Sequence, residues 1–99
     1  MRQFAIIGLG RFGASVARTL TDKKHQVLAI DADENIVQDL SDSVTQAVCL
    51  DATDQKALKA VGIESVDVAV CAIGNDLKAS TLVTLNLKEI GIKEIVCKA

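Results

Sequence analysis

Three glycines near the start of the chain have the spacing G-x-G-x-x-G, in the segment GLGRFG at residues 8–13. An apolar run, FAII at residues 4–7, precedes them, and a helical pattern follows. In this setting Gly8 permits a tight turn, Gly10 lets a diphosphate approach the backbone, and Gly13 lets the helix pack close to the strand. Free N–H groups at the positive end of the helix would then hold the phosphates. The segment predicts a nucleotide site; the alternative is a tight turn that binds nothing.

Asp31 closes the next apolar run, where an acidic side chain would accept hydrogen bonds from the hydroxyls of a ribose. The residues after it, ADEN, offer no cation. A 2′-phosphate about 4 Å from the carboxylate would be repelled by about 4 kcal/mol at an effective dielectric constant near 20. NADP is therefore disfavoured as the ligand. The alternative for Asp31 is an ordinary loop or capping acid, and Asp33 fits a helix cap better than a ligand.

Arg11 is the one cation inside the glycine segment. Its guanidinium could balance negative phosphate charge that the backbone N–H groups do not neutralise. A ligand with an extra phosphate, such as ATP, would gain the most affinity from this interaction. The alternative is an arginine that points into solvent.

Two more polar segments follow strand-like runs. Residues 51–53 (DAT) follow the third run, and residues 74–76 (GND) follow the fourth. Open α/β sheets bind ligands at the carboxyl ends of their strands, so Asp51 could border an adenine and Asn75 could reach a ribose or a phosphate. As ordinary turn and helix-start residues, both segments would bind nothing. Lys98, after the fifth run, is a weaker candidate.

Short apolar runs alternate with helical patterns along the chain, which indicates parallel strands joined by helical crossovers. The runs are continuously apolar, as expected for strands that are covered on both faces. They are residues 4–7, 27–30, 47–50, 68–73 and 95–97. We predict an α/β fold: a Rossmann-like, doubly wound parallel sheet of about five strands in the order 3-2-1-4-5, with helices on both faces.

Apolar spacing predicts helices between these strands. The first would bury a stripe formed by Phe12, Val16 and Leu20. The fourth covers roughly residues 77–90, and Gly91 follows it in the usual helix-ending position. Its apolar sector is wider than the usual stripe of about 100°. The extra width favours either a contact between subunits or an additional contact within the chain.

Composition excludes several classes of function. The formal net charge is −2 and the isoelectric point about 5.2, so the chain lacks the basic field that holds nucleic acid. Two phenylalanines are the only aromatic residues, which leaves no platform for stacking bases. Every apolar run is far shorter than the roughly 20 residues that cross a bilayer. The 99 residues are enough for one domain and too few for two.

Residues that could carry other chemistry are few. Cys49, Cys71 and Cys97 lie in apolar runs without a CxxC pair, so we expect buried, reduced thiols rather than a metal or redox site. His25 lies in a polar turn, and we expect it at the surface. No nucleophile has a partner base placed to act beside a nicotinamide, so we expect no enzyme activity. Two alternatives stay open: the cofactor half of an NAD-dependent oxidoreductase that lacks its substrate domain, and a scaffold with a vestigial pocket.

Several segments together resemble the amino-terminal RCK (TrkA-N) domain of TrkA/KtrA-type potassium-uptake regulators. The segments are FAIIGLGRFG at residues 4–13, VLAIDADE at 27–34, LDATD at 50–54, VAVCAIGND with ASTL through residue 82, and KEIGIKEIVCKA to the end. The likeness covers nearly the whole chain. GLGRFG and the AIG and AST segments are far more specific than the glycine spacing alone.

The resemblance implies a non-enzymatic regulatory subunit that binds NAD(H), ATP or ADP and gates an integral-membrane potassium transporter. It also implies a homo-oligomer, a dimer within an octameric ring, in the cytoplasm at the inner face of the membrane. Such domains continue past the fifth strand, so we expect residues 1–99 to be a domain truncated at that point. The spacing and the resemblance together give these candidate cofactor-binding residues: Gly8, Leu9, Gly10, Arg11, Phe12, Gly13, Asp31, Ala32, Asp33, Asp51, Ala52, Thr53, Ala72, Ile73, Gly74, Asn75 and Lys98.

Overall fold

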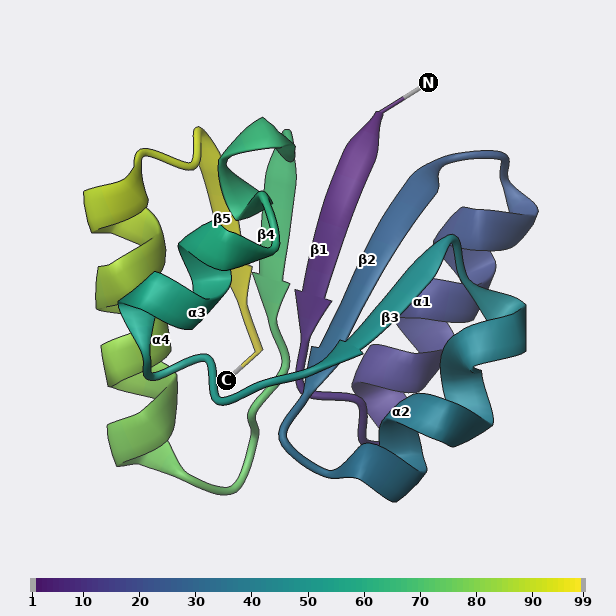
Figure 1. Ribbon diagram of the computed structural model, residues 1–99, viewed down its shortest axis with the longest axis horizontal. Helices are drawn as coiled ribbons and strands as arrows, with labels where there is room; N and C mark the ends of the chain where they lie inside the picture. Colours follow the sequence, from purple (N-terminus) through teal and green to yellow (C-terminus); the bar gives the residue numbers. More distant parts are fainter. Residues whose placement is uncertain (1, 99) are drawn as a thin grey trace.

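The computed structural model describes residues 2–98, and strands and helices alternate along them. Figure 1 shows how these elements are arranged in space. Their bounds, in chain order, are β1 (Gln3–Ile7), α1 (Arg11–Asp22), β2 (Gln26–Asp31), α2 (Glu34–Leu40), the short 3-10 helix η1 (Ser41–Ser43), β3 (Gln46–Cys49), α3 (Gln55–Ala60), the 3-10 helix η2 (Ile63–Ser65), β4 (Val68–Cys71), α4 (Leu77–Ile90) and β5 (Glu94–Cys97).

The strands form one parallel sheet in the order β3-β2-β1-β4-β5, which confirms the predicted topology. The chain enters the sheet at its centre and moves outward in one direction. It then crosses back beside β1 and moves outward in the other. Ile7, at the end of β1, is level with Ile30 of β2 on one side and with Cys71 of β4 on the other. The three central strands therefore end together, at the point where the order of the strands reverses.

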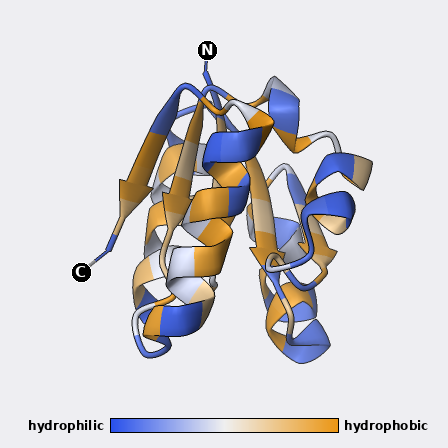
Figure 2. Ribbon diagram, turned by 90° about the vertical axis from the view of Figure 1, so that its left-hand side faces the viewer, coloured by the Kyte–Doolittle hydropathy of each residue, from blue (hydrophilic) through white to orange (hydrophobic). Residues whose placement is uncertain are grey.

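Helices cover both faces of the sheet, α3 and α4 on one side and α1 and α2 on the other (Figure 1). Each face has its own buried apolar cluster, and consecutive residues of one strand enter opposite clusters. In β1, Ile6 packs with the cluster beneath α1 and α2, and Ile7 packs with the one beneath α3 and α4. Figure 2 shows the hydrophobic residues concentrated in the strands. Burial on both faces explains why the strand sequences are continuously apolar instead of alternating.

Aspartates begin three of the helices. Asp33 caps α2 as predicted, because its carboxylate accepts a hydrogen bond of 2.9 Å from the N–H of Asn35. Asp54 and Asp76 cap α3 and α4 in the same way. Gly91 ends α4 with a φ of +99°, a conformation that strongly favours glycine.

Two predictions at the ends of β4 and on α1 were wrong in detail. The fourth apolar run was expected to be a strand through Ile73, but β4 ends at Cys71. Directly after β4, the backbone of Ala72 passes so close to Gly8 that a Cβ on Gly8 would lie 3.0 Å from it. Phe12 was expected in the buried stripe of α1, but its side chain is 45% exposed. The residues of α1 that are fully covered are Gly13 and Ala17, because small side chains let the helix lie close to the sheet.

The expected burial of the three cysteines is confirmed only for Cys71. Cys49 and Cys97 are exposed. They end β3 and β5, the two edge strands of the sheet, where helices cover less of the surface. An apolar run therefore indicates a strand without indicating that the strand lies at the centre of the sheet.

Candidate functional site

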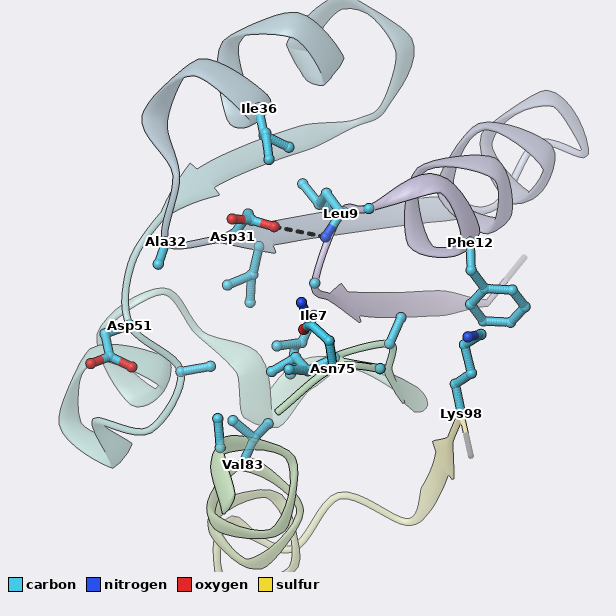
Figure 3. A pocket seen from close by; sticks show the side chains of 18 of the residues that line it. Ile7, Leu9, Phe12, Asp31, Ala32, Ile36, Asp51, Asn75, Val83 and Lys98 are labelled. Carbon is cyan, nitrogen blue, oxygen red and sulfur yellow. Dashed lines mark hydrogen bonds between the residues drawn. The ribbon is translucent and has the colours of Figure 1, made fainter. Parts of the chain in front are cut away.

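A cavity of about 780 Å³ lies at the carboxyl end of the sheet, where β1, β2 and β4 end together. Its size is in the range of ordinary small-molecule sites. Figure 3 shows side chains from both halves of the fold lining it. The lining residues are Ile7, Gly8, Leu9, Gly10, Arg11, Phe12, Ile30, Asp31, Ala32, Ile36, Leu50, Asp51, Ala52, Thr53, Ala72, Ile73, Gly74, Asn75, Ala79, Val83 and Lys98.

The glycine segment forms the turn between β1 and α1, and each of its glycines has a different environment. Gly8 has a φ of +94°, and its N–H donates a 2.8 Å hydrogen bond to the carbonyl of Ile30. A Cβ on Gly8 would approach the Ala72 backbone to 3.0 Å, and one on Gly13 would collide with the carbonyl oxygen of Gly8. By contrast, a Cβ on Gly10 would meet nothing within 4 Å. The first and third glycines are required by packing, and the second borders open space in the cavity wall.

Asp31 connects the end of β2 to the glycine segment. One carboxylate oxygen accepts a 2.8 Å hydrogen bond from the backbone N–H of Leu9 (Figure 3). The other accepts a 2.8 Å bond from the N–H of Asp33. A carboxylate has about four acceptor positions, so both oxygens keep room for further donors. Asp31 therefore positions the glycine segment and still has capacity for a ligand hydroxyl.

Asp51 and Thr53 form a local turn at the end of β3. The Thr53 hydroxyl donates to the Asp51 carboxylate at 2.7 Å, and the Thr53 N–H donates to the same oxygen at 2.9 Å. These bonds stabilise the charged form of the acid and lower the pKa of Asp51 below its ordinary value of 3.8, the hydroxyl having the larger effect. The carboxylate is exposed at the cavity rim, and near neutral pH it is ionised.

Cationic side chains line the cavity beside the glycine segment and at the end of β5. Arg11 begins α1 and is exposed. The Lys98 ammonium lies 5.6 Å from the centre of the Phe12 ring, within the range of a cation–π contact. Figure 3 places this pair on the opposite side of the cavity from Asp51. Lys98 and Asp51 thus lie on opposite sides of the cavity, and Arg11 is a second cation in its lining.

The structure brings most of the predicted site residues to this one cavity. Gly13 and Asp33 are the exceptions. Gly13 is buried beneath the glycine turn, where it lets α1 approach, and Asp33 is occupied as the cap of α2. Both are explained by local structure.

Sequence reasoning missed six apolar residues of the lining, which are Ile7, Ile30, Ile36, Leu50, Ala79 and Val83. A signal for some of these was present, since Ile7, Ile30 and Leu50 lie at or beside the carboxyl ends of predicted strands. It also missed Asn86, whose side-chain amide donates to the backbone carbonyls of Ala52 at 3.1 Å and Thr53 at 2.9 Å. No local pattern marks that contact, because it joins residues more than thirty positions apart.

The remaining reactive side chains lie apart from the cavity or form no cluster. His25 is at the amino end of the sheet, where its ring packs edge-on against Phe4 at 5.2 Å and its Nδ1 accepts from the Arg2 N–H. Over residues 2–98, no group of three or more histidine, cysteine or acidic residues could hold a metal ion. None of the helices in the same range has the length and apolar character needed to cross a membrane.

Sequence comparisons identify the family of this chain. The TrkA-N domain family matches residues 4–99. Ktr system potassium uptake proteins C and A of Bacillus subtilis are 42% and 44% identical to this chain over 98 residues. Each alignment covers 99% of this chain and 44% of the relative, so the chain spans less than half the length of these curated relatives.

Solved structures share the fold. The NAD(P)-binding domain of an exopolyphosphatase-related protein from Archaeoglobus fulgidus superposes with a TM-score of 0.83 at 25% identity, covering 97% of this chain and 72% of that one. The Kef carboxyl-terminal domain of Shewanella denitrificans in an AMP-bound form has a TM-score of 0.81 at 20% identity, covering 98% and 58%. The fold is Rossmann-like, and the chain belongs to the TrkA-N domain family.

Proposed function

We propose that this chain is the nucleotide-binding domain of a regulatory subunit in a potassium uptake system. Family membership and the two Ktr relatives support this assignment. The observation that carries it is the joining of the glycine segment to Asp31 at one edge of a 780 Å³ cavity. A phosphate site and a ribose site are thereby held side by side, at the point where strand order reverses.

The ligand of this domain is an adenine nucleotide: NAD(H), ATP or ADP. The N–H groups at the start of α1 hold the phosphates, and Gly10 leaves the space that a diphosphate needs. Asp31 accepts from the ribose hydroxyls, and its charge disfavours the 2′-phosphate of NADP. The turn at residues 51–53 borders the adenine, and residues 72–75 with Lys98 complete the cavity on the phosphate side.

The domain acts as a sensor and not as an enzyme. Bound nucleotide changes the packing of subunits in a homo-oligomer, and an integral-membrane potassium transporter subunit responds to that packing from the cytoplasmic side. A ligand can do this only through different affinities for two states: moving a ratio from 1:99 to 99:1 requires a preference of about 5.5 kcal/mol. Residues 1–99 supply the nucleotide-binding part of the longer regulatory protein.

Calorimetric titration with ATP, ADP, NADH and NAD⁺, combined with light scattering to measure oligomer size, tests this function. We expect saturable binding of one equivalent per chain, different affinities among the four, and a size that depends on the nucleotide. Equal affinities with no change in assembly would contradict sensing. Absence of binding by all four would contradict the nucleotide site itself.

A further inference from the structure

A side chain of α4 fixes one wall of the cavity. Asn86 points its amide nitrogen at two successive backbone carbonyls of the β3–α3 connection, Ala52 at 3.1 Å and Thr53 at 2.9 Å. Both partners are acceptors, so only the NH₂ end of the side chain fits there. Asn86 is half-buried and lies three positions after Val83, which lines the cavity. The bond therefore crosses directly from the helix to the cavity wall.

The same connection is held from its other side by Asp51. The Asp51 carboxylate accepts from the Thr53 N–H, and the Asp51 carbonyl accepts from the N–H of Asp54. Asp51 therefore accepts hydrogen bonds from N–H groups of this connection, and Asn86 donates hydrogen bonds to its carbonyls. Among the described residues, none accepts a hydrogen bond from the N–H of Ala52. Ala52 lines the cavity, and its N–H is a donor that none of the described residues occupies.

We infer that Asn86 is a positioning residue, which sets the base preference of the site by holding the carbonyls of residues 52 and 53 against α4. The inference rests on the proposed nucleotide site, with its base beside Ala52. In the proposed site, the Ala52 N–H donates a hydrogen bond to N1 of adenine, which is an acceptor. Guanine has an N1–H at the same position, so two donors would face each other and no bond would form. Without the Asn86 amide, the carbonyls of residues 52 and 53 are released and their peptide groups can rotate. These carbonyls can then accept hydrogen bonds from a base, in addition to the bonds that the wall donates. Selectivity between the two purines then falls.

The test uses two variants of this residue and a matched control. Asn86→Leu removes the side-chain donors, and leucine preserves the helix because it is a good helix former. Asn86→Asp keeps the size of the side chain but replaces the donor with an acceptor. Gln55→Leu is the control. The Gln55 side chain also joins α3 to α4, through a 3.0 Å bond to Glu89, but it does not touch the carbonyls of residues 52 and 53. Circular dichroism checks that each variant is folded.

Calorimetry with ATP and with GTP supplies the readout. We expect Asn86→Leu to weaken the binding of ATP roughly tenfold and the binding of GTP much less. The dissociation constant for GTP divided by that for ATP should therefore fall by at least about threefold. Asn86→Asp should act in the same direction, and Gln55→Leu should leave the ratio unchanged. A merely structural contribution of Asn86 would weaken both ligands equally.

An unchanged ratio in both folded variants of Asn86 would overturn the inference while leaving nucleotide binding intact. Failure of the unaltered protein to bind either nucleotide would instead overturn the proposed function, and the inference with it. If Asn86→Leu does not fold, Asn86→Asp carries the comparison.

Discussion

The Asp31 carboxylate, at the end of β2, lies 2.8 Å from the backbone N–H of Leu9 and accepts a hydrogen bond from it. The bond joins the end of β2 to the loop that follows β1. It fixes the glycine segment before any ligand arrives, which reduces the ordering that binding must supply. The same carboxylate is the group that we assign to the ribose, so loop position and sugar recognition depend on one side chain.

Replacing this acid should relax the choice between the two nicotinamide dinucleotides. Asp31→Asn keeps an acceptor oxygen near Leu9 but removes the charge that repels a 2′-phosphate. We expect the unaltered protein to bind NADH at least about tenfold more tightly than NADPH, and the variant to narrow that ratio. Competition titrations measure both. An identical ratio in the variant would show that Asp31 does not face the ribose.

The second and third glycines of the turn should respond in opposite ways to alanine. In Gly13→Ala the new methyl would collide with the Gly8 carbonyl oxygen, which is backbone and cannot move aside. We expect a loss of about 2 kcal/mol or more in the free energy of unfolding. Urea denaturation followed by circular dichroism measures it. A variant as stable as the original would mean that α1 does not pack so closely on the turn.

Gly10→Ala is the matched opposite case, because a Cβ there meets nothing within 4 Å. Its φ of −68° is acceptable for alanine, so stability should fall by less than about 1 kcal/mol. The methyl would occupy space that we assign to a diphosphate, and we expect nucleotide affinity to fall at least about tenfold. Unchanged affinity in the folded variant would place the phosphates elsewhere.

Removing the arginine of the glycine segment should reduce the affinity for a triphosphate more than the affinity for a diphosphate. Arg11→Ala should weaken the binding of ATP by roughly tenfold to a hundredfold, the range of a charge-assisted hydrogen bond. It should weaken the binding of NAD⁺ less. Arg18→Ala, also exposed on α1, removes the same charge farther along the helix and is the control. Equal losses for ATP and NAD⁺ in Arg11→Ala would exclude contact with a terminal phosphate.

The turn at the end of β3 makes a prediction about pH. Hydrogen bonds from Thr53 depress the pKa of Asp51 below 3.8 in the folded protein. Such a group adds stability above pH 3.8, and that stability is lost as the pH falls through the lower folded value. In Thr53→Val the hydroxyl is missing and the backbone N–H remains, so the pKa of Asp51 should rise partway toward 3.8. NMR titration of the carboxyl carbon measures this, and an unchanged value would exclude the hydroxyl as the main cause.

Local sequence signals predicted most of the fold. The order of the sheet followed from short apolar runs with helices between them, and the cap of α2 and the end of α4 followed from Asp33 and Gly91. The cap and the helix end depend on backbone conformation and on neighbours within a few residues, which a sequence displays directly. The strand order is not local, and it was predicted through the fold class that the alternation of runs and helices indicates.

Features that depend on packing between distant segments were harder to predict. Phe12 has the spacing of a buried residue, yet it lies at the mouth of the cavity beside Lys98. Cys49 and Cys97 have apolar neighbours, yet they end edge strands and are exposed. Asn86 was missed altogether, because a single asparagine in a helix gives no indication of the loop that it contacts. In each case the deciding information is which surface the completed fold leaves open.

A crystal structure of the protein with ADP tests the central claim most directly. We predict electron density in the cavity, with the diphosphate on the N–H groups at the start of α1 and a ribose hydroxyl within hydrogen-bond distance of the Asp31 carboxylate. A nucleotide bound at some other place, or a cavity filled by its own side chains at saturating ADP, would contradict the account.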